Sequence, residues 1–221
     1  DMIVAQHDLL TDGLEVNHLL IVMGTSMGGM NSWMWGEMYP DFMDGLMPLA
    51  SLPGPMSGRN RMMRRMMKDD IVEDPGYDGG DYTTQPLGLR AALQLMFMMT
   101  SSPRQLQKQA PTTAAADAYI ERWMQRVSEH EDANDYLYAF EASRDYDPSP
   151  NLDRIVAPLI AINSADDARN RAELHVTADA VKQLKDARYY EVPASAQTRG
   201  HSTTGSAHWY AGELKRFLDE K

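Results

Sequence analysis

Short apolar runs alternate with longer stretches of helical spacing at both ends of this 221-residue chain. Four runs are too short for helices and are bounded by glycine or proline, which is typical of strands buried on both faces of a parallel sheet. These candidate strands lie at 18–23, 45–52, 158–162 and 187–192. The candidate helices lie at 1–15, 27–39, 171–185 and 205–219. Strands alternating with helices predict an α/β fold with a parallel sheet.

The alternation stops in the middle of the chain, from 54 to 150. Apolar residues there recur at helical spacing, and segments rich in proline and glycine separate the helical stretches. The expected helices lie near 56–68, 87–99, 112–129 and 132–143. We therefore expect a core made of 1–53 and 151–221, with 54–150 inserted as a helical lid.

The segment 24–28 fits the pattern G-x-S-x-G, with Ser26 at its centre. A predicted strand ends just before it and a predicted helix follows, which is the setting in which this pattern holds a nucleophilic serine. The turn is so tight that the neighbours of the serine must be small, and Gly24 and Gly28 meet that need. The backbone N–H of Met27, at the start of the helix, is placed to stabilise an oxyanion.

A serine hydroxyl is a weak nucleophile unless a base accepts its proton, and in this arrangement the chain order is serine, acid, histidine. Of the six histidines, only His201 and His208 follow the last predicted strand. His208 falls within the predicted terminal helix, which packs outside the sheet. His201 lies in a polar loop that can reach the carboxyl ends of the strands. We therefore predict that His201 is the base.

The acid must fix the tautomer of the imidazole and stabilise the imidazolium that forms. Asp166 and Asp167 both follow the predicted strand at 158–162, so either is placed to serve. The other aspartate would then cap the next helix. Spacing alone does not separate the two residues.

The stretch 24–30 resembles the homoserine O-acetyltransferase branch of the α/β-hydrolases, which typically reads GGSMGGMQ at this point. The stretch 74–82 is similar to that family's lid pattern DPxWxxGxY, and the later motifs match at Asp167 and at 200–201. The resemblance implies an α/β-hydrolase fold with a Ser-His-Asp triad. It also implies that Asp167 is the acid of the two candidates, because it falls on the aspartate of the family pattern DxLFPP.

One lid segment departs from the family pattern. Members usually carry an arginine in a motif like ARMxGHITY, whereas Leu93 stands at that place in the matching stretch 92–98. With Met96 and Phe97 nearby, Leu93 is expected to line an apolar substrate pocket. Homoserine is zwitterionic and strongly hydrated, so a pocket without the cation would bind it poorly. We therefore expect an apolar or bulkier ester as substrate.

Two methionine clusters and a group of basic residues lie in the expected lid. The methionines within 62–67 and 96–99 either fill the core of the lid or form an adaptable wall over the substrate. The basic residues beside the first cluster are Arg59, Arg61, Arg64, Arg65 and Lys68. Their side chains form either the solvated face of a helix or a contact for an anionic substrate or for the phosphates of CoA.

The composition narrows the partners further. With 21 basic and 32 acidic residues the net charge is −11, which argues against nucleic acid as the main partner, because phosphate binding needs a basic face. No apolar run approaches the roughly 18–20 residues of a membrane-spanning helix, so no membrane partner is expected. The chain has no cysteine and shows no spacing of metal ligands. We expect neither a metal site nor a cofactor.

Only one predicted helix and one predicted strand precede Ser26, whereas members of the family have several strands before the nucleophile. We therefore expect the N-terminal strands to be missing from this chain and to belong to a separate segment or subunit that completes the fold. The second oxyanion donor would come from that piece, because it follows an upstream strand in this fold. The lid is in addition a candidate surface for a homodimer.

Three functions compete. The leading hypothesis is hydrolysis of a small-molecule carboxylic ester through an acyl-enzyme on Ser26. The alternative is acyl transfer to an alcohol by the same triad, with acetyl-CoA as co-substrate. The third is a non-catalytic binding protein that keeps the fold. The presence of a nucleophile, an acid and a base in the expected order favours the first two.

Overall fold

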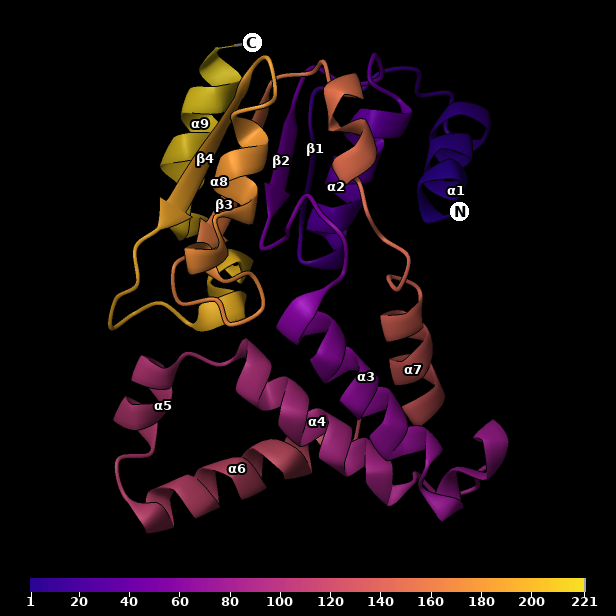
Figure 1. Cartoon of the computed structure of the whole chain (residues 1–221), viewed down its shortest axis with the longest axis vertical. Helices are drawn as coiled ribbons and strands as arrows, with labels where there is room; N and C mark the ends of the chain where they lie inside the picture. The colour runs from indigo at the N-terminus through magenta and orange to yellow at the C-terminus, as the bar shows by residue number, and fades with distance from the viewer. Residues whose placement is uncertain (221) are drawn as a thin grey trace.

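The computed structural model describes residues 1–220, and its centre is a parallel sheet in which four strands follow one another in chain order (Figure 1). These strands are β1 (Val22–Thr25), β2 (Leu46–Leu49), β3 (Leu159–Ser164) and β4 (Ala187–Val192). Each pair of neighbours is parallel, and the β3–β4 pairing runs from Leu159 opposite Ala187 to Ser164 opposite Val192. The predicted α/β fold with a parallel sheet is confirmed.

Helices cover both faces of the sheet, because alternate side chains of a strand point to opposite faces. The helices of the sheet region are α1 (Met2–Asp8), which continues as a π-helix over Leu9–Gly13, α2 (Met27–Met38), α8 (Val176–Val181) and α9 (Ala211–Asp219). Leu46 and Leu159 pack in one apolar cluster with Trp33 of α2. Met47 and Ile160 pack in another cluster, on the opposite face, with Phe217 of α9.

Two predicted strands have different bounds in the structure. The run at 18–23 joins the sheet only from Val22, since Leu19 makes a single isolated bridge to Met43, and β1 then extends to Thr25. The run at 45–52 is a strand only over Leu46–Leu49, because Ala50 has a positive φ of 48° that turns the chain away from the sheet.

Two predicted helices begin later than expected. The helix predicted at 171–185 begins at Val176, after His175, whose left-handed backbone (φ 54°) separates it from a 3-10 turn at Ala172–Leu174. The helix predicted at 205–219 begins at Ala211. Two 3-10 turns, Gly200–Gly205 and Ala207–Trp209, precede it, so His208 lies before α9 and not within it.

The segment between β2 and β3 is helical, as predicted, and lies beyond the carboxyl ends of the strands (Figure 1). Its helices are α3 (Gly58–Val72), α4 (Leu87–Thr100), α5 (Pro103–Gln109), α6 (Thr113–Ser128) and α7 (Ala133–Glu141), with 3-10 turns at Pro75–Gly80 and Ser149–Arg154. The pattern of apolar residues did not predict α5, whose residues are all partly or fully exposed. The division into a core and a lid domain at 54 and 150 stays a prediction.

The helical segment has its own apolar cluster. Its buried members are Met63, Met67, Ile71, Leu89, Ala92, Leu93, Met99, Met124 and Ala133. Met62 and Met66 are instead 68% and 55% exposed, on the outer side of α3. The methionines of the first cluster therefore divide between core filling and surface, which follows from their helical spacing.

We expect the substitution Gly88→Ala to destabilise the contact between α3 and α4. A Cβ at position 88 would clash with the carbonyl oxygen of Asp70 and lie 2.7 Å from its carbonyl carbon, so the helices would have to separate. Overpacking of this kind costs about 1–3 kcal/mol of unfolding free energy, measured by chemical denaturation. As a control, Gly212→Ala in α9 meets no atom within 4 Å and should be neutral or slightly stabilising. An unchanged denaturation midpoint for Gly88→Ala would contradict the expectation.

Candidate active site

Ser26 occupies the turn between β1 and α2 in a conformation that few L-residues adopt. Its φ is 56° and its ψ is −116°. Its backbone N–H donates a 2.9 Å hydrogen bond to the carbonyl of Leu49, and its own carbonyl accepts one of 2.9 Å from the N–H of Met30. The turn is therefore fastened to β2 on one side and to the first turn of α2 on the other, which holds the Ser26 hydroxyl at the carboxyl ends of the strands.

The glycines around Ser26 differ in why they are needed. A Cβ at Gly24 would lie 2.5 Å from the backbone carbonyl of Gly28, and one at Gly29 would lie 2.6 Å from the Ser51 hydroxyl. A Cβ at Gly28 would meet nothing within 4 Å. We expected a side chain at position 28 to be crowded, and this expectation is therefore wrong. The close approaches are at Gly24, which faces the Gly28 backbone, and at Gly29, which faces β2.

Ser26, His201 and Asp167 form a continuous hydrogen-bonded chain. The Ser26 Oγ lies 2.8 Å from His201 Nε2, and His201 Nδ1 lies 2.8 Å from Asp167 Oδ2. An ionised carboxylate only accepts hydrogen bonds, so Nδ1 carries the proton and Nε2 is left to accept the one donated by the serine hydroxyl. This geometry brings together the three side chains that were predicted as nucleophile, base and acid.

Asp167 is held as a buried carboxylate by several donors. Its side chain is fully buried, and its Oδ1 accepts a 2.8 Å hydrogen bond from the N–H of Arg169. Its Oδ2 accepts one of 2.9 Å from the side-chain amide of Asn170, besides the bond from His201. Burial raises the pKa of Asp167, but His201 and these donors outweigh that effect and leave the pKa below its ordinary value. The group is therefore ionised at neutral pH, as its role with an imidazole requires.

Asp166 has a different set of partners. Its carboxylate accepts hydrogen bonds from the hydroxyls of Ser164 (2.6 Å) and Thr198 (2.9 Å). Thr198 belongs to the loop that leads from β4 to His201, so Asp166 ties this loop to the end of β3. Although Asp166 and Asp167 are adjacent in sequence, only Asp167 reaches the imidazole.

His201 sits in the first 3-10 turn after β4, where two contacts fix its backbone. Gly200 has a positive φ of 61°, and a Cβ there would lie 3.0 Å from the carbonyls of Thr100 and Ser101 at the end of α4. The hydroxyl of Thr204 lies 2.7 Å from that of Thr25, the residue before Ser26. These contacts place the imidazole, whose side chain is 11% exposed, directly against Ser26.

The other histidine after β4 is not part of this arrangement. His208 Nδ1 lies 2.7 Å from the hydroxyl of Ser206, in an exposed turn. Met27 is the first residue of α2, where backbone N–H groups have no partner inside the helix and the helix dipole is positive. Its role as an oxyanion donor stays a prediction.

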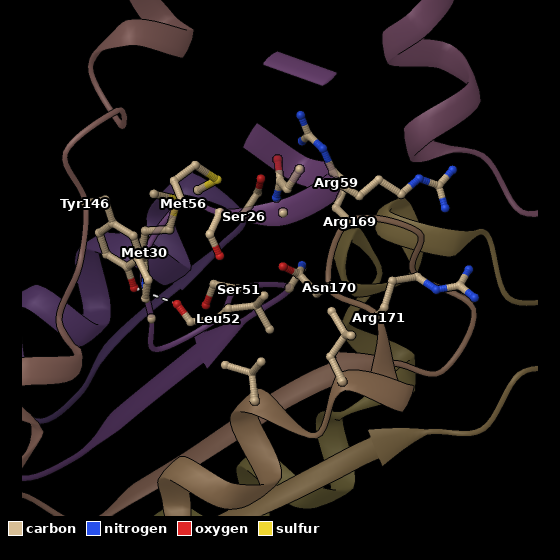
Figure 2. A pocket seen from close by; sticks show the side chains of 18 of the residues that line it. Ser26, Met30, Ser51, Leu52, Met56, Arg59, Tyr146, Arg169, Asn170 and Arg171 are labelled. Atoms are coloured by element: carbon tan, nitrogen blue, oxygen red, sulfur yellow. Dashed lines mark hydrogen bonds between the residues drawn. The ribbon is translucent and has the colours of Figure 1, made fainter. Parts of the chain in front are cut away.

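A cavity of about 150 Å³ opens beside Ser26 and His201. Met30, Met56 and Tyr146 lie on one side of Ser26, and Arg59, Arg169 and Arg171 lie on the other (Figure 2). Tyr146 is fixed by a 2.9 Å hydrogen bond from its hydroxyl to the carbonyl of Leu52. The cavity therefore has an apolar wall and a cationic wall.

The sequence analysis assigned no role to the two arginines in the loop after β3, which also carries Asp167. Arg169 and Arg171 follow Asp167 by two and four residues, so their closeness to the site could have been read from the position of the acid. Arg59 and Arg64 also line the cavity, whereas Arg61 and Lys68 pair with Glu141 and Arg65 pairs with Asp69. The basic group on α3 thus divides between the cavity and salt bridges on the lid.

Leu93, Met96 and Phe97 lie elsewhere than expected. Leu93 and Phe97 are buried inside the helical segment, 3% and 7% exposed, and Phe97 packs against Trp123 of α6 with ring centroids 4.7 Å apart. Met96 packs on the same cluster, with its sulfur 3.3 Å from the guanidinium of Arg169. None of the three lines the cavity at Ser26, so the expected apolar pocket at these residues is corrected.

Within residues 1–220, no helix combines the length and the apolar character that crossing a membrane needs. The same residues hold no group of three or more histidine or acidic side chains placed to bind a metal ion.

Comparison with known proteins points to one group of enzymes, although no family model matches the chain. A homoserine O-acetyltransferase from Haemophilus influenzae is 31% identical over 181 residues, which cover 74% of this chain and 49% of that protein. A homoserine O-succinyltransferase from Magnetococcus marinus is 26% identical over 188 residues, covering 74% of this chain and 47% of that protein. The chain thus spans about half the length of these curated relatives.

Solved structures show the same fold. A homoserine O-acetyltransferase from Bacillus anthracis superimposes with a TM-score of 0.85 at 22% identity, over 98% of this chain and 64% of that one. The acetyl esterase MekB superimposes with a TM-score of 0.82 at 21% identity, over 99% of this chain and 66% of that one. Together, the sequence relatives and the shared fold confirm the resemblance seen in the motifs. The chain belongs to the α/β-hydrolase superfamily, in its homoserine O-acetyltransferase-like branch.

Proposed function

We propose that this chain carries the catalytic serine of an enzyme that cleaves carboxylic esters through an acyl-enzyme. The observation that carries the proposal is the hydrogen-bonded chain from Ser26 to His201 to Asp167, with 2.8 Å at each step. A serine whose hydroxyl already donates to a neutral imidazole is activated for attack, and a buried carboxylate stabilises the imidazolium that results. The same observation disfavours a binding protein that keeps only the fold.

In the first half-reaction the Ser26 Oγ attacks the carbonyl carbon of the ester while His201 Nε2 accepts the hydroxyl proton. The backbone N–H of Met27 stabilises the oxyanion of the tetrahedral intermediate. The intermediate collapses to the acyl-enzyme, and the alcohol leaves with the proton from His201. In the second half-reaction His201 accepts a proton from water while the oxygen of water attacks the acyl carbon. The tetrahedral intermediate then collapses as His201 gives that proton to the Ser26 Oγ, which releases the carboxylic acid and restores the serine hydroxyl.

Acyl transfer is the second candidate, favoured by the names of the sequence relatives. In that reaction acetyl-CoA acylates Ser26 and an alcohol replaces water as the attacking group, with His201 again accepting the proton. Acetyl-CoA is then a co-substrate, and the chemistry needs no other cofactor. The two functions differ only in what attacks the acyl-enzyme, so a competition experiment separates them.

We expect hydrolysis to dominate when the protein receives acetyl-CoA or 4-nitrophenyl acetate together with homoserine or a panel of other alcohols. Release of acetate and formation of the O-acetyl product are measured in the same reaction, by chromatography. Water is the acceptor that the proposed ester hydrolysis requires. O-acetyl product formed faster than acetate would establish the transferase instead. A chain carrying Arg90→Met, an exposed change at a pair with Glu121, serves as the matched control.

The edge of the sheet is where we expect a further polypeptide to bind. Within residues 1–220, β1 pairs with β2 on one side and with no strand on the other. Met23 is 40% exposed and Leu20 is 58% exposed along this edge. An unpaired edge accepts another strand, so the expected N-terminal segment or subunit would pair here and would supply the second oxyanion donor. That partner and a homodimer through the lid stay predictions.

A further inference from the structure

Arg169 is a partly buried cation without an anionic partner. It lies in the loop after β3, two residues beyond Asp167, and lines the cavity at Ser26. Its Nε is buried and has no hydrogen-bond partner, and its Nη2 faces the sulfur of Met96 at 3.3 Å. A thioether is a weak acceptor. Within residues 1–220 no carboxylate oxygen approaches the Arg169 guanidinium within salt-bridge distance.

Such a group is costly unless something binds to it. Buried charges in proteins are ordinarily paired, and a buried donor without an acceptor carries most of its desolvation penalty. Burial lowers the pKa of Arg169 below its ordinary value, while the nearby Asp167 carboxylate opposes that shift. The Asp167 oxygens are already occupied by His201, Asn170 and the backbone of the loop. Asp167 therefore does not satisfy the free donors of Arg169.

The other residues that line the cavity add to its excess of positive charge. Four arginines line it (Arg59, Arg64, Arg169 and Arg171), and no aspartate or glutamate does. This is unexpected in a chain with a net charge of −11. Burial lowers the pKa of Arg64 to about 10, and the positive charge of Arg169 contributes to that shift. The cavity thus gathers like charges that an incoming anion would relieve.

The four arginines are not equally free. Arg64 donates to Asn60 and Ser143, at 3.0 and 2.7 Å, and Arg171 pairs with Glu173 at 2.6 Å. Arg59 makes no ion pair within residues 1–220, but it is exposed and belongs to the first turn of α3. Of the four, Arg169 alone combines a buried Nε that has no hydrogen-bond partner with a position on the loop that carries Asp167.

We propose that the substrate of the Ser26 site is an ester that carries a free carboxylate, and that the Arg169 guanidinium binds this carboxylate. The inference rests on the proposed esterase or acyltransferase function and names its substrate class. A guanidinium binds a carboxylate through two parallel hydrogen bonds, which orients the ester as well as holding it. A cavity of about 150 Å³ beside the nucleophile suits a short acyl or alkyl chain between the two groups. This replaces the apolar ester expected from Leu93, Met96 and Phe97.

The carboxylate can sit on either side of the ester, and two pairs of probes distinguish the sides. On the acyl side, 4-nitrophenyl hemiglutarate is compared with its neutral methyl ester. On the alcohol side, 4-acetoxybutanoate is compared with 4-acetoxybutanamide. The readout is the ratio of kcat/KM for the charged ester to that for the neutral ester, after subtraction of the rate with Ser26→Ala protein.

We expect the unaltered protein to prefer the charged ester by about tenfold or more in at least one pair, since hydrogen bonds between two charged groups are stronger than those between neutral groups. The preference should fall about tenfold in Arg169→Met and be partly kept in Arg169→Lys. It should be unchanged in Arg90→Met, an exposed arginine of α4 paired with Glu121. A merely structural role for Arg169 would lower both rates and leave the ratio in place, which would overturn the proposal.

A binding experiment separates this proposal from the proposed function. Glutarate is titrated into Ser26→Ala protein by calorimetry, in which no turnover is needed. If glutarate binds about tenfold more weakly to the double variant Ser26→Ala/Arg169→Met than to Ser26→Ala, the carboxylate site is supported even if no ester is cleaved. The absence of both a charge preference and glutarate binding would refute it, as would a preference that falls equally in Arg90→Met.

Discussion

Ser26→Ala protein should lose ester hydrolysis by a factor of about 10⁶ in kcat, because nucleophile, base and acid act as one unit. Without the hydroxyl, only substrate binding and oxyanion stabilisation by the N-terminus of α2 remain to accelerate direct attack by water. The measurement is release of 4-nitrophenol from 4-nitrophenyl acetate, together with covalent labelling by a fluorophosphonate probe. The alanine fits the turn, since only the Oγ that contacts His201 is removed.

The variant His201→Ala tests whether the base belongs to the same unit as Ser26. His201→Ala should be nearly as inactive as Ser26→Ala, and the double variant should be no worse than either single one, because the contributions of a triad are not additive. Both proteins should denature at midpoints close to that of the unaltered protein. Equal fluorophosphonate labelling of the unaltered and Ser26→Ala proteins would refute the assignment of Ser26.

Asp167→Asn should lower kcat by about 10⁴ while leaving the fold intact. The amide has nearly the same shape as the carboxylate, but its NH₂ group faces Nδ1 and favours the tautomer in which Nε2 carries the proton. That tautomer cannot accept the proton of Ser26. The substitution also removes the negative charge that stabilises the imidazolium. Steady-state kinetics on 4-nitrophenyl acetate measures the loss.

Asp166→Asn is the matched control, one residue away on the same loop. Its carboxylate accepts from Ser164 and Thr198 and does not contact His201, so an amide oxygen can keep one of these hydrogen bonds. Loss of the other costs about 1 kcal/mol and should slow the reaction by at most about tenfold, through the loop that carries His201. If Asp166→Asn were the more damaging of the two, the assignment of the acid would be reversed.

The lid residues that were expected to line the substrate pocket do not line the cavity at Ser26. Leu93 and Phe97 belong to the interior of the helical segment, where their burial stabilises α4 against α3 and α6. The cavity at Ser26 is lined instead by residues at the start of α3 and in the loop after β3, together with Met30, Met56 and Tyr146. The cavity therefore offers a cationic wall beside its apolar one, and the proposal of a charged ester rests on that wall.

Local patterns in the sequence predicted most of the fold and the nucleophile. A short apolar run, a tight G-x-S-x-G turn and a helical pattern are consecutive in the chain, so Ser26 could be located without tertiary information. Chain order left His201 and His208 as candidates for the base, and His201 was preferred because His208 was assigned to the terminal helix. The helical nature of 54–150 followed from its periodicity, although the exposed α5 lacked an apolar face and was missed.

Tertiary structure alone decided what depends on direction and distance. Asp166 and Asp167 are neighbours that spacing cannot separate. In the folded chain one carboxylate turns towards Thr198 and the other towards His201. Likewise, an apolar pattern on α4 shows that Leu93 and Phe97 are buried but not against what. The cavity at Ser26 joins residues more than 100 positions apart, so only the folded chain shows that Arg59 and Arg64 meet Arg169 and Arg171 there and that no carboxylate lines the cavity.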